Sequence, residues 1–486
     1  MPARNFVVAI ELSSTKIKGI AGQKKSDGSI AVLAVVSEDA RQCIRNGVVY
    51  NIDKTVQCIT NIVHRLRSQL KANIKHVYIG VGGQSIHSER NVIVKEIRNG
   101  IPVTQQLIVE MMDQNRGMEY PDIEILDVEV QEYRADSLMQ TDPVGILCSR
   151  LDGNFLNILQ SKRHYQKLNS CFDKAGIKLA EIYLAPFALA DAVLTPVEKR
   201  SGCVLVDMGA DTTTVMVYYK NIIRHVAVIP LGGNNITKDI CSLQVEDTDA
   251  ENLKLRYASA YTAPEDIDVS LKYDIDRDRK VESSRFIEIV EARVQEIIAN
   301  VWNQVPQDFV DKILGGIVLT GGAANMKNMD VAFRKQLKID KVRQAKFVTY
   351  TINSTNAEIN AHDGTMNTLL GLLAKGDQNC YAAEEPKKPQ DMFEDNAAES
   401  DSAAPDVTLR DPHTLPSGVV PTAAEKEAAA RRTAEEKKRK EEEEAARVAA
   451  AEEAAQKAAE DIGGKKKPGL GAKLVKWLSG FTAPEE

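Results

Sequence analysis

The segment Cys203–Ile240 constrains the fold of this 486-residue chain more than any other. It contains three apolar runs of strand length, separated by short polar turns: Cys203–Val206, Val215–Tyr219 and Ile222–Ile229. Asp207 ends the first run, and a turn with Gly209 follows it. Backbone N–H groups in such a turn form a nest that binds phosphate without a lysine. The hydroxyls of Thr212 and Thr213 add donors, and Asp207 is placed to hold a hydrated Mg²⁺.

Taken alone, this segment is equally consistent with an ordinary antiparallel hairpin, because the D-x-G-x-x-T pattern is short. A second unit of the same design near the N-terminus favours the phosphate interpretation. There the strand run Phe6–Ile10 leads into Glu11, a hydroxyl-rich turn at Ser13–Lys16 and another strand at Ile17–Ala21. We expect Glu11 and Asp207 to be the two carboxylates of one metal site.

Two further segments suit the rest of a nucleotide. The strand within Gly315–Ala324 runs into a glycine-rich turn, where a base and sugar can lie close to the backbone. Glu251 and Lys254 are three residues apart on a predicted helix, so they share a face and can reach a ribose and an adenine.

The order of these elements resembles the actin and sugar-kinase superfamily and, within it, the FtsA family of bacterial cell-division proteins. The similar stretches are IPLGGNNITKDI (229–240), EDTDAENLKLRYAS (246–259), IVLTGGAANM (317–326) and residues 128–159. The resemblance runs from about residue 6 to about residue 375 and resumes in the last residues. It implies an α/β fold, namely an actin-like (ribonuclease H-like) two-domain ATPase fold with an inserted α+β subdomain. It also implies ATP and Mg²⁺ as ligands.

On the residues and the resemblance together, the predicted nucleotide-binding residues are Ser13, Ser14, Thr15, Lys16, Gly209, Asp211, Thr212, Thr213, Gly232, Gly233, Asn234, Glu251, Lys254, Gly321, Gly322 and Ala323. Glu11 and Asp207 are the predicted metal ligands. Two residues depart from the family pattern, because Ser13 and Asp211 stand where the family usually has glycine. A side chain at residue 13 hinders close approach of the backbone to phosphate. A carboxylate at residue 211 repels phosphate unless a cation or backbone donors offset the repulsion. We therefore expect ATP binding with slow or absent turnover, and we assign no catalytic residue.

Composition points to a soluble intracellular protein. The net charge of −7 gives no domain-wide basic surface, so we expect no nucleic-acid partner. The seven cysteines are scattered and none forms C-x-x-C, which favours buried thiols in a reducing compartment over disulfides or a zinc site. No apolar stretch approaches the roughly 20 residues of a membrane-spanning helix.

Changes of pattern divide the chain into seven segments. Residues 1–84 are expected to begin the first actin-like domain, and 163–202 and 346–380 to complete it. Residues 85–162 form the inserted α+β subdomain, which the resemblance associates with self-assembly and contacts with later division proteins. Residues 203–345 form the second domain with the nucleotide loops and the partner-binding part. Residues 381–464 are a linker, and 465–486 carry a terminal amphipathic helix.

The linker has two compositions. Residues 381–422 hold many Pro, Asp, Glu and Ala and few periodic apolar residues, so we expect disorder there. Residues 423–461 are nearly all Ala, Glu, Lys and Arg, which fits either a solvated single helix or a charged coil, without the heptads of a coiled coil. The linker is interpreted as a spacer, although an unselected low-complexity tail has the same composition.

The last segment has the pattern of a short helix that lies on an anionic membrane. On a helix its apolar residues share an arc of about 100°, with lysines beside the arc. These residues are Leu470, Lys473, Leu474, Lys476, Trp477, Leu478 and Phe481. The alternative is a terminal helix docked onto the protein's own core. FtsA proteins also end in an amphipathic membrane-targeting helix, so the resemblance favours the membrane.

A long amphipathic helix is predicted at Ser283–Trp302, with a core stripe and an opposite face. On that face Arg285 and Arg293 flank Ile289, which is also what an ordinary solvated face looks like. In the FtsA family this region receives the C-terminal peptide of the tubulin-like protein FtsZ. The resemblance therefore makes Arg285, Ile289 and Arg293 candidates for that contact.

The resemblance implies an ATP-binding, self-assembling protein that tethers the FtsZ ring to the inner face of the cytoplasmic membrane at the division site. Its implied partners are FtsZ, further copies of itself, the anionic membrane and later division proteins. Two other classes stay open: an actin-like adaptor similar to PilM or MreB, and a small-molecule kinase of the same superfamily. An MreB-like chain would lack the insertion, a PilM-like chain would lack the terminal helix, and a kinase has no evident use for a spacer.

Overall fold

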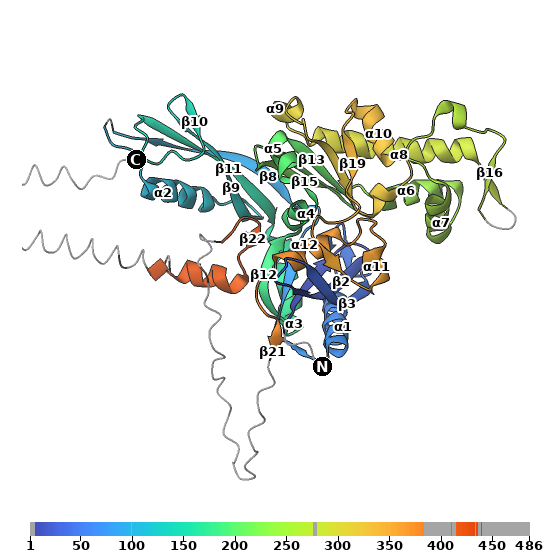
Figure 1. Ribbon diagram of the computed structural model, residues 1–486, viewed down its shortest axis with the longest axis horizontal. Coiled ribbons are helices and arrows are strands. Elements are labelled where there is room, and N and C mark those ends of the chain that lie inside the picture. The colour runs from blue at the N-terminus through green and yellow to red at the C-terminus, as the bar shows by residue number, and fades with distance from the viewer. Residues whose placement is uncertain are drawn as a thin grey trace, which may run out of the picture. The chain divides into compact units, whose positions relative to one another are not determined.

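The computed structural model describes residues 5–98, 100–275, 279–382, 410, 415–432, 434–435 and 439. These residues cluster into two units. One unit holds the chain up to Ala382 together with residues 415–422, and it contains the two large sheets of the described residues (Figure 1). In the other unit, residues 423–432 are helical.

The first sheet has seven strands in the order β20-β3-β2-β1-β7-β12-β22. Its main strands are β1 (Val7–Leu12), β2 (Lys16–Lys24), β3 (Ile30–Asp39), β7 (His76–Val81) and β12 (Lys178–Leu184). The first three form an antiparallel meander, and β7 and β12 then run parallel to β1. Because the β1–β2 connection is only three residues long, the hydroxyl-rich turn is held tightly at one end of the sheet.

The second sheet repeats this design. Its antiparallel meander consists of β13 (Cys203–Met208), β14 (Thr213–Tyr219) and β15 (Ile222–Ile229), which confirms the three strands predicted for this segment. Strand β18 (Gly316–Thr320) pairs in parallel with β13, and β19 (Val342–Gln344) pairs in parallel with β18. Parallel pairing brings the carboxyl ends of β13 and β18 to the same edge, with Asp207 opposite Thr320.

The inserted subdomain has the α+β composition that the sequence predicts. It contains β8 (His87–Glu96), α2 (Gln105–Arg116), β9 (Ile123–Ala135), β10 (Leu138–Gln140) and β11 (Arg150–Ser161). Helix α2 packs on one face of these strands around a separate core with Ile93, Met111 and Phe155. The strands are continuous with the second sheet through the pair His87 and Ala227, so that sheet has nine strands.

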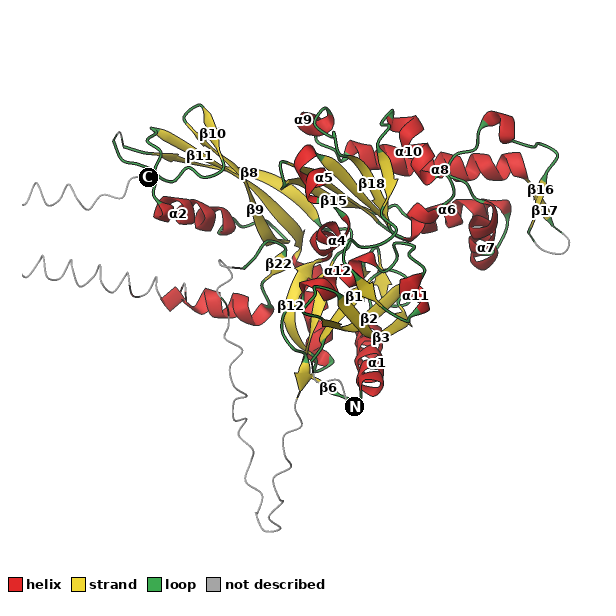
Figure 2. Ribbon diagram, in the orientation of Figure 1, coloured by secondary structure: helices red, strands yellow, loops and turns green. Residues whose placement is uncertain are grey.

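Helices flank both sheets (Figure 2). Their bounds are α1 (Ile52–Leu70), α3 (Lys162–Lys174), α4 (Ala185–Val193), α5 (Pro196–Ser201), α6 (Gly233–Ile240), α7 (Asp247–Tyr257), α8 (Ser283–Asn303), α9 (Gln307–Val310), α10 (Met329–Leu337), α11 (Ala357–Asn360) and α12 (Asn367–Lys375). The short strands are β4 (Ile44–Arg45), β5 (Val48–Val49), β6 (Asn73–Ile74), β16 (Lys272–Asp274), β17 (Lys280–Glu282), β20 (Ile352–Asn353), β21 (Tyr381–Ala382) and β22 (Val419–Val420).

Local sequence explains where the first long helix begins and ends. The side chain of Asn51 accepts a hydrogen bond from the backbone N–H of Lys54 and so caps the first turn of α1. Lys71 takes a left-handed conformation at the other end and stops the helix. The buried face of α1, which includes Ile59, Ile62 and Leu66, then packs on the first sheet.

The expected disorder of residues 381–422 is wrong at two places. Tyr381–Ala382 form β21, which pairs with β6. Residues 415–422 lie against the first domain, where β22 adds an antiparallel strand to the edge of β12. The physical reason is local, because Val419 and Val420 are adjacent apolar residues in an otherwise polar linker and both are buried. The remaining residues of 381–422, except Arg410, lie outside the described residues.

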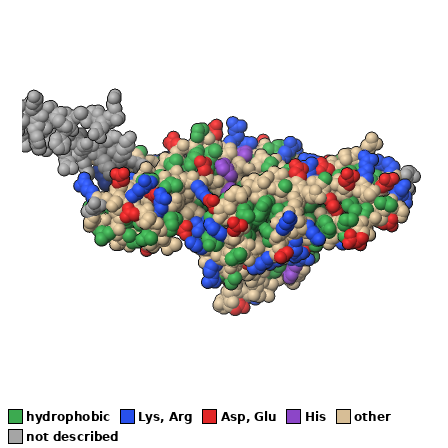
Figure 3. Space-filling view, turned by 90° about the horizontal axis from the view of Figure 1, so that it is seen from above, with side chains coloured by type: hydrophobic (Ala, Val, Ile, Leu, Met, Phe, Trp, Pro, Cys, Tyr) green, Lys and Arg blue, Asp and Glu red, His purple; other side chains and the backbone are tan. Residues whose placement is uncertain are grey.

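In the described part of the chain, no helix has both the length and the apolar character needed to cross a lipid bilayer. Acidic and basic side chains are interspersed on the face of the protein shown in Figure 3. That face therefore carries no large field of a single sign.

Candidate nucleotide site

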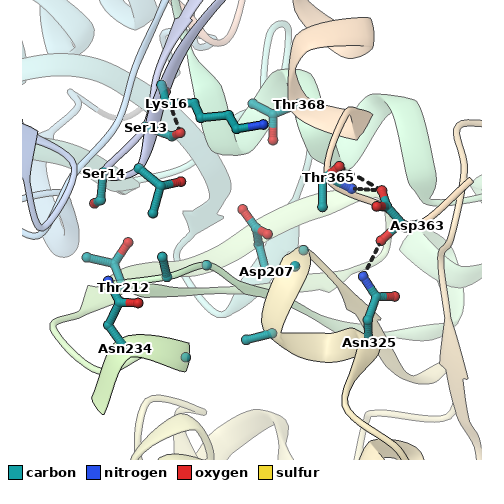
Figure 4. A pocket seen from close by; sticks show the side chains of 18 of the residues that line it. Ser13, Ser14, Lys16, Asp207, Thr212, Asn234, Asn325, Asp363, Thr365 and Thr368 are labelled. Atoms are coloured by element: carbon teal, nitrogen blue, oxygen red, sulfur yellow. Dashed lines mark hydrogen bonds between the residues drawn. The ribbon is translucent and has the colours of Figure 1, made fainter. Parts of the chain in front are cut away.

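A cleft of about 1120 Å³ lies between the two sheets and is lined by residues of both domains. Its walls come from the two meander turns, the end of β18, helix α7 and the loop before α12 (Figure 4). The carboxylate of Asp207 stands between the turn at Ser13–Lys16 and the loop at Thr365. Ligand pockets in proteins typically have volumes of roughly 300–1,000 Å³, so this cleft has room for a nucleoside triphosphate.

The first turn is held by its own hydrogen bonds and by a neighbouring loop. Ser13 donates from its backbone N–H and from its hydroxyl to the carbonyl of Lys16, at 3.1 and 2.7 Å. Ser14 is buried, and its Oγ accepts from the backbone N–H of Gly47 at 2.9 Å. The side chain of Ser13 is therefore folded back onto its own turn.

The second turn is fixed against the start of α6. Gly209 N–H donates to the carbonyl of Thr212 at 2.8 Å, and Asn234 N–H donates to the carbonyl of Ala210 at 2.7 Å. These bonds close a rigid loop whose lining includes Gly209 and Thr212. Preformed backbone geometry of this kind suits the binding of an anion.

Glu11 and Asp207, the two predicted metal ligands, both line the cleft. Burial raises the pKa of Glu11, with the charge of Lys18 opposing the shift. Burial, followed by repulsion from Glu11, raises the pKa of Asp207 to about 7. The two carboxylates are therefore close enough to repel each other, and the charge of Lys18 offsets that repulsion only in part.

A divalent cation fits this pair. The Oε2 atom of Glu11 is buried and has no hydrogen-bond partner, which is costly unless a cation or its water shell satisfies it. No group of three or more His, Cys, Asp or Glu suitable for a metal occurs among the described residues. Two carboxylates with water and phosphate oxygens in the other positions are the usual surroundings of Mg²⁺ rather than of zinc.

The glycine-rich turn after β18 forms another wall of the cleft, close to Asp207. Gly321 has a φ of +88°, and a Cβ atom there would lie 2.4 Å from Asp207 Oδ1. Only glycine allows the backbone to pass this close to the carboxylate. Asn325 then donates to the carbonyl of Asp363 at 2.7 Å, and the carboxylate of Asp363 accepts from the N–H and hydroxyl of Thr365.

Helix α7 contributes an ion pair and a hydroxyl network. Lys254 Nζ lies 2.7 Å from Glu251 Oε2, which confirms that the two side chains share a face. The same Nζ donates to Thr237 Oγ1 at 2.8 Å and to the carbonyl of Gly233 at 3.0 Å. The network contains an ammonium donor, a carboxylate acceptor and a hydroxyl, which are groups that can bind the hydroxyls of a ribose.

The site can now be compared with known proteins. The family model described as "Cell division protein FtsA" matches residues 204–360, and the model "SHS2 domain inserted in FTSA" matches residues 83–159. The FtsA of Porphyromonas gingivalis is 31% identical over 390 residues, which cover 78% of this chain and 80% of that protein. The chain belongs to the FtsA family. It is thus a cell-division protein of the actin-like class, and the kinase and other adaptor alternatives are set aside.

A second FtsA relative and one solved structure agree with this assignment. The FtsA of Neisseria meningitidis is 33% identical over 331 residues, covering 66% of this chain and 80% of that protein. The PilM-PilN type IV pilus biogenesis complex matches with a TM-score of 0.54 at 13% identity, over 76% of this chain and 98% of that one. The likeness to the pilus protein concerns the fold alone, which is the predicted actin-like one.

In this FtsA-family chain, all the predicted nucleotide residues line the cleft except three. Thr213 is buried and donates from its hydroxyl to the carbonyl of Leu231, so its role is structural. Gly232 packs against the second turn, where a Cβ atom would lie 2.5 Å from the carbonyl oxygen of Ala210.

Asp211 is the third exception, and it corrects the expected repulsion. Its carboxylate accepts from the backbone N–H of Asn46 at 3.1 Å and from the side-chain amide of Asn234 at 2.8 Å. It therefore links a loop of the first domain to the start of α6 and is not among the residues that line the cleft. The N–H of Asn46 is a backbone donor of the kind that offsets repulsion between this carboxylate and phosphate.

Several lining residues were missed by the sequence interpretation, notably Lys18, Asp363, Thr365 and Thr368. Lys18 is the one with a detectable signal, because it is a lysine between apolar residues of the strand run predicted at Ile17–Ala21. It is buried, pairs across the sheet with Glu11 and donates to the carbonyl of Thr365 at 2.6 Å. The loop of Asp363 and Thr365 has no comparable pattern in the sequence.

The helix that the sequence suggested for the partner contact is α8, and its predicted core stripe is buried. Arg293 is engaged within the protein, since its guanidinium contacts Asp239 of α6 and Glu296. Ile289 packs partly against the domain's own core, whereas Arg285 is exposed. The predicted membrane residues, from Leu470 to Phe481, lie outside the described residues.

Proposed function

We propose that this FtsA-family protein binds ATP with Mg²⁺ in the cleft and tethers the FtsZ ring to the inner face of the cytoplasmic membrane. In this role it assembles with further copies of itself and helps to recruit later division proteins. The observation that carries the nucleotide part is the pair of half-buried carboxylates, Glu11 and Asp207, between two rigid turns.

Each wall of the cleft is assigned one part of the ligand. The turns that contain Ser14 and Thr212 would hold the phosphates through backbone N–H groups and hydroxyls. Glu11 and Asp207 would hold Mg²⁺ through its water shell, and the ion would neutralise phosphate charge. The network of Glu251 and Lys254 would hold the ribose, and Gly321–Ala323 would pass beside the base.

Slow or absent turnover remains part of the proposal, and it now rests on the first turn alone. Ser13 fills the position that is usually glycine, and its hydroxyl is engaged with the carbonyl of Lys16. A purified monomer that hydrolysed ATP at a robust rate in a radiolabelled assay would contradict this part.

Nucleotide binding is tested directly by calorimetry with Mg-ATP on the full chain. Lys254→Ala should weaken binding at least tenfold, because Lys254 holds both Glu251 and the start of α6. Lys280→Ala is the matched control, since Lys280 is an exposed lysine in β17 that pairs with Asp274 and does not line the cleft. Equal affinities of the two variants for Mg-ATP would contradict the assignment of this cleft as the nucleotide site.

Membrane attachment is tested with the terminal segment of the full chain. Trp477→Glu should abolish co-sedimentation with anionic liposomes and leave ATP binding intact, because it places a charge on the predicted apolar face. Ser479→Glu adds the same charge on the opposite side of the predicted helix, at about 100° per residue, and should change little. Unchanged sedimentation of Trp477→Glu would refute the anchor.

The FtsZ peptide is proposed to bind at α8, with Arg285 as the most available of the three candidates. Arg293 is less suited to a direct contact, because it holds Asp239. Arg285→Glu should therefore weaken binding of the FtsZ C-terminal peptide in a fluorescence-anisotropy titration. Normal binding by this variant would remove Arg285 from the site.

A further inference from the structure

A short segment beyond the first domain returns to it and completes its sheet. We call residues 415–422 the strap. Val420 is paired with Ile182 and Val419 with Tyr183, in antiparallel register along the free edge of β12. Leu184 N–H donates to the carbonyl of Gly418 at 2.8 Å and continues this ladder. Both valines are buried, so the strap occupies a formed groove.

The groove has walls from two parts of the protein. On the side of the insertion, β9 supplies Asp127, which accepts from Gly418 N–H at 2.7 Å, and Glu129, which accepts from the hydroxyl of Ser417. On the side of the first domain, the hydroxyl of Tyr165 in α3 donates to the carbonyl of Pro421. The strap therefore joins the insertion to the first domain.

Three features keep the docked strap only weakly held. Its ladder consists of two paired residues on a sheet edge. Its buried apolar side chains are those of Val419 and Val420 alone, so little apolar area holds it in place. It also closes a loop of 32 residues (414 − 382) from the end of β21, and loop closure has an entropic cost. Segments of this kind open locally long before the domain unfolds.

We propose that the strap is a detachable strand that sets the length of the tether between the actin-like domains and the terminal membrane segment. The tether-length part rests on the proposed membrane attachment, whereas detachment itself does not. With the strap docked, 42 residues (464 − 422) separate it from Lys465. With the strap released, 82 residues (464 − 382) separate β21 from Lys465. Residues 423–432 are helical and rise by about 1.5 Å each, and the other residues extend to roughly 3.6 Å each at most. The greatest reach therefore rises from about 130 Å to about 270 Å.

Release would also leave the edge of β12 and the carboxylates of β9 uncovered. The occupant of this groove is the strap itself, because its backbone bonds, its two valines and its glycine all fit there. Gly418 has a φ of +80°, and a Cβ atom at this residue would lie 3.1 Å from Phe187. The strap therefore has glycine at residue 418, where a side chain would strain the backbone and crowd Phe187.

Hydrogen exchange on the full chain, without lipid or nucleotide, tests detachment. In the wild type, the Leu184 amide should exchange at least tenfold faster than the amides of β7 in the same sheet. Val420→Asp should accelerate exchange at Leu184 a further tenfold or more and leave β7 unchanged, which also shows that the domain is folded. Val197→Asp, a matched change at a valine that is 60% exposed, should have no effect. Wild-type protection at Leu184 equal to that of β7 would show that the strap opens only with the whole sheet and would overturn the proposal.

The tether length is tested on a supported bilayer of phosphatidylcholine and phosphatidylglycerol. Neutron reflectometry should place the globular layer of Val420→Asp farther from the bilayer than that of the wild type. An unchanged height together with fast exchange would overturn the link between the strap and the tether. Absence of both proteins from the bilayer would overturn the tether length together with the proposed anchor, while the exchange result would still decide detachment.

Discussion

Asp211 illustrates how a single residue acquires a role that its local pattern does not indicate. In sequence it belongs to a phosphate-binding turn, but its carboxylate is used between Asn46 of the first domain and Asn234 of the second. A backbone N–H and a side-chain amide are both satisfied by it. Asn46 also has a φ of +48°, so the loop it belongs to depends on such contacts.

Replacing Asp211 by glycine, the residue usual in the family, should loosen this loop. The change removes two hydrogen bonds to a charged acceptor, which we expect to cost about 1–2 kcal/mol because the site is only partly buried. Exchange of the amides in residues 44–50 should accelerate, and the midpoint of urea unfolding should fall. Asp211→Asn keeps one acceptor and should have a smaller effect. No change in either measurement for the glycine variant would contradict the role of Asp211 as a link.

Gly321 is the second residue whose replacement is informative. Gly321→Ala should abolish Mg-ATP binding, because its Cβ atom would lie 2.4 Å from Asp207 Oδ1 and would displace the carboxylate. The strained backbone should add roughly 1–3 kcal/mol of destabilisation. Gly28→Ala is the control, since Gly28 has a φ of +80° with nothing near its side-chain position. Calorimetry in which both variants bind as tightly as the wild type would be incompatible with this geometry.

At the scale of elements, the strands and long helices of both domains were predictable and the edge strand β22 was not. Helix α8 and the meander β13–β15 have clear apolar periodicity, and the turns between the strands carry their own signals. Strand β22 has only two apolar residues in a polar linker, which is too short for any periodicity. Its formation depends on the free edge of β12, and pairing between distant segments is not visible in local pattern.

The residues of the cleft also divide into those that the sequence predicts and those that it does not. The turns at Ser13–Lys16 and Gly209–Thr212 were predictable because their glycine and hydroxyl residues follow strands directly. Lys18 left a signal as a lysine between apolar residues, whereas the loop at Asp363–Thr365 enters the cleft only because of where it lies before α12. Spatial placement of this kind has no counterpart in residue spacing.

The stability of the protein should depend on pH through Glu129, the carboxylate that accepts from Ser417 of the strap. Burial and the neighbouring Asp127 raise the pKa of Glu129 from 4.5 to about 7, while its contact with Ser417 opposes the shift. Because the pKa is raised in the folded state, the protonated form is favoured there, and stability is lost as the pH rises from about 4.5 to about 7. Relative to Glu129→Gln, the wild type should lose about 1–2 kcal/mol of apparent stability between pH 5 and pH 7.5. If the free energy of unfolding in urea changed with pH equally in the wild type and in Glu129→Gln, Glu129 would not titrate in this range.

At the scale of the whole molecule, the protein has a candidate nucleotide cleft, an inserted subdomain and a terminal segment that the sequence predicts to bind a membrane. A single short amphipathic helix binds membrane weakly, but several joined in a filament bind with a much higher effective affinity without new contacts. Assembly that is favoured by nucleotide would therefore increase attachment. This coupling is the central claim, because it gives the cleft and the terminal segment one purpose.

The measurement that tests the claim most directly is co-sedimentation with anionic liposomes, with and without Mg-ATP. It compares the full chain with a form truncated after Gly464. The account predicts that the full chain binds, that Mg-ATP increases the bound fraction and that the truncated form stays in solution under both conditions. Binding of ATP by the full chain with no attachment to liposomes, or attachment that survives the truncation, would contradict it.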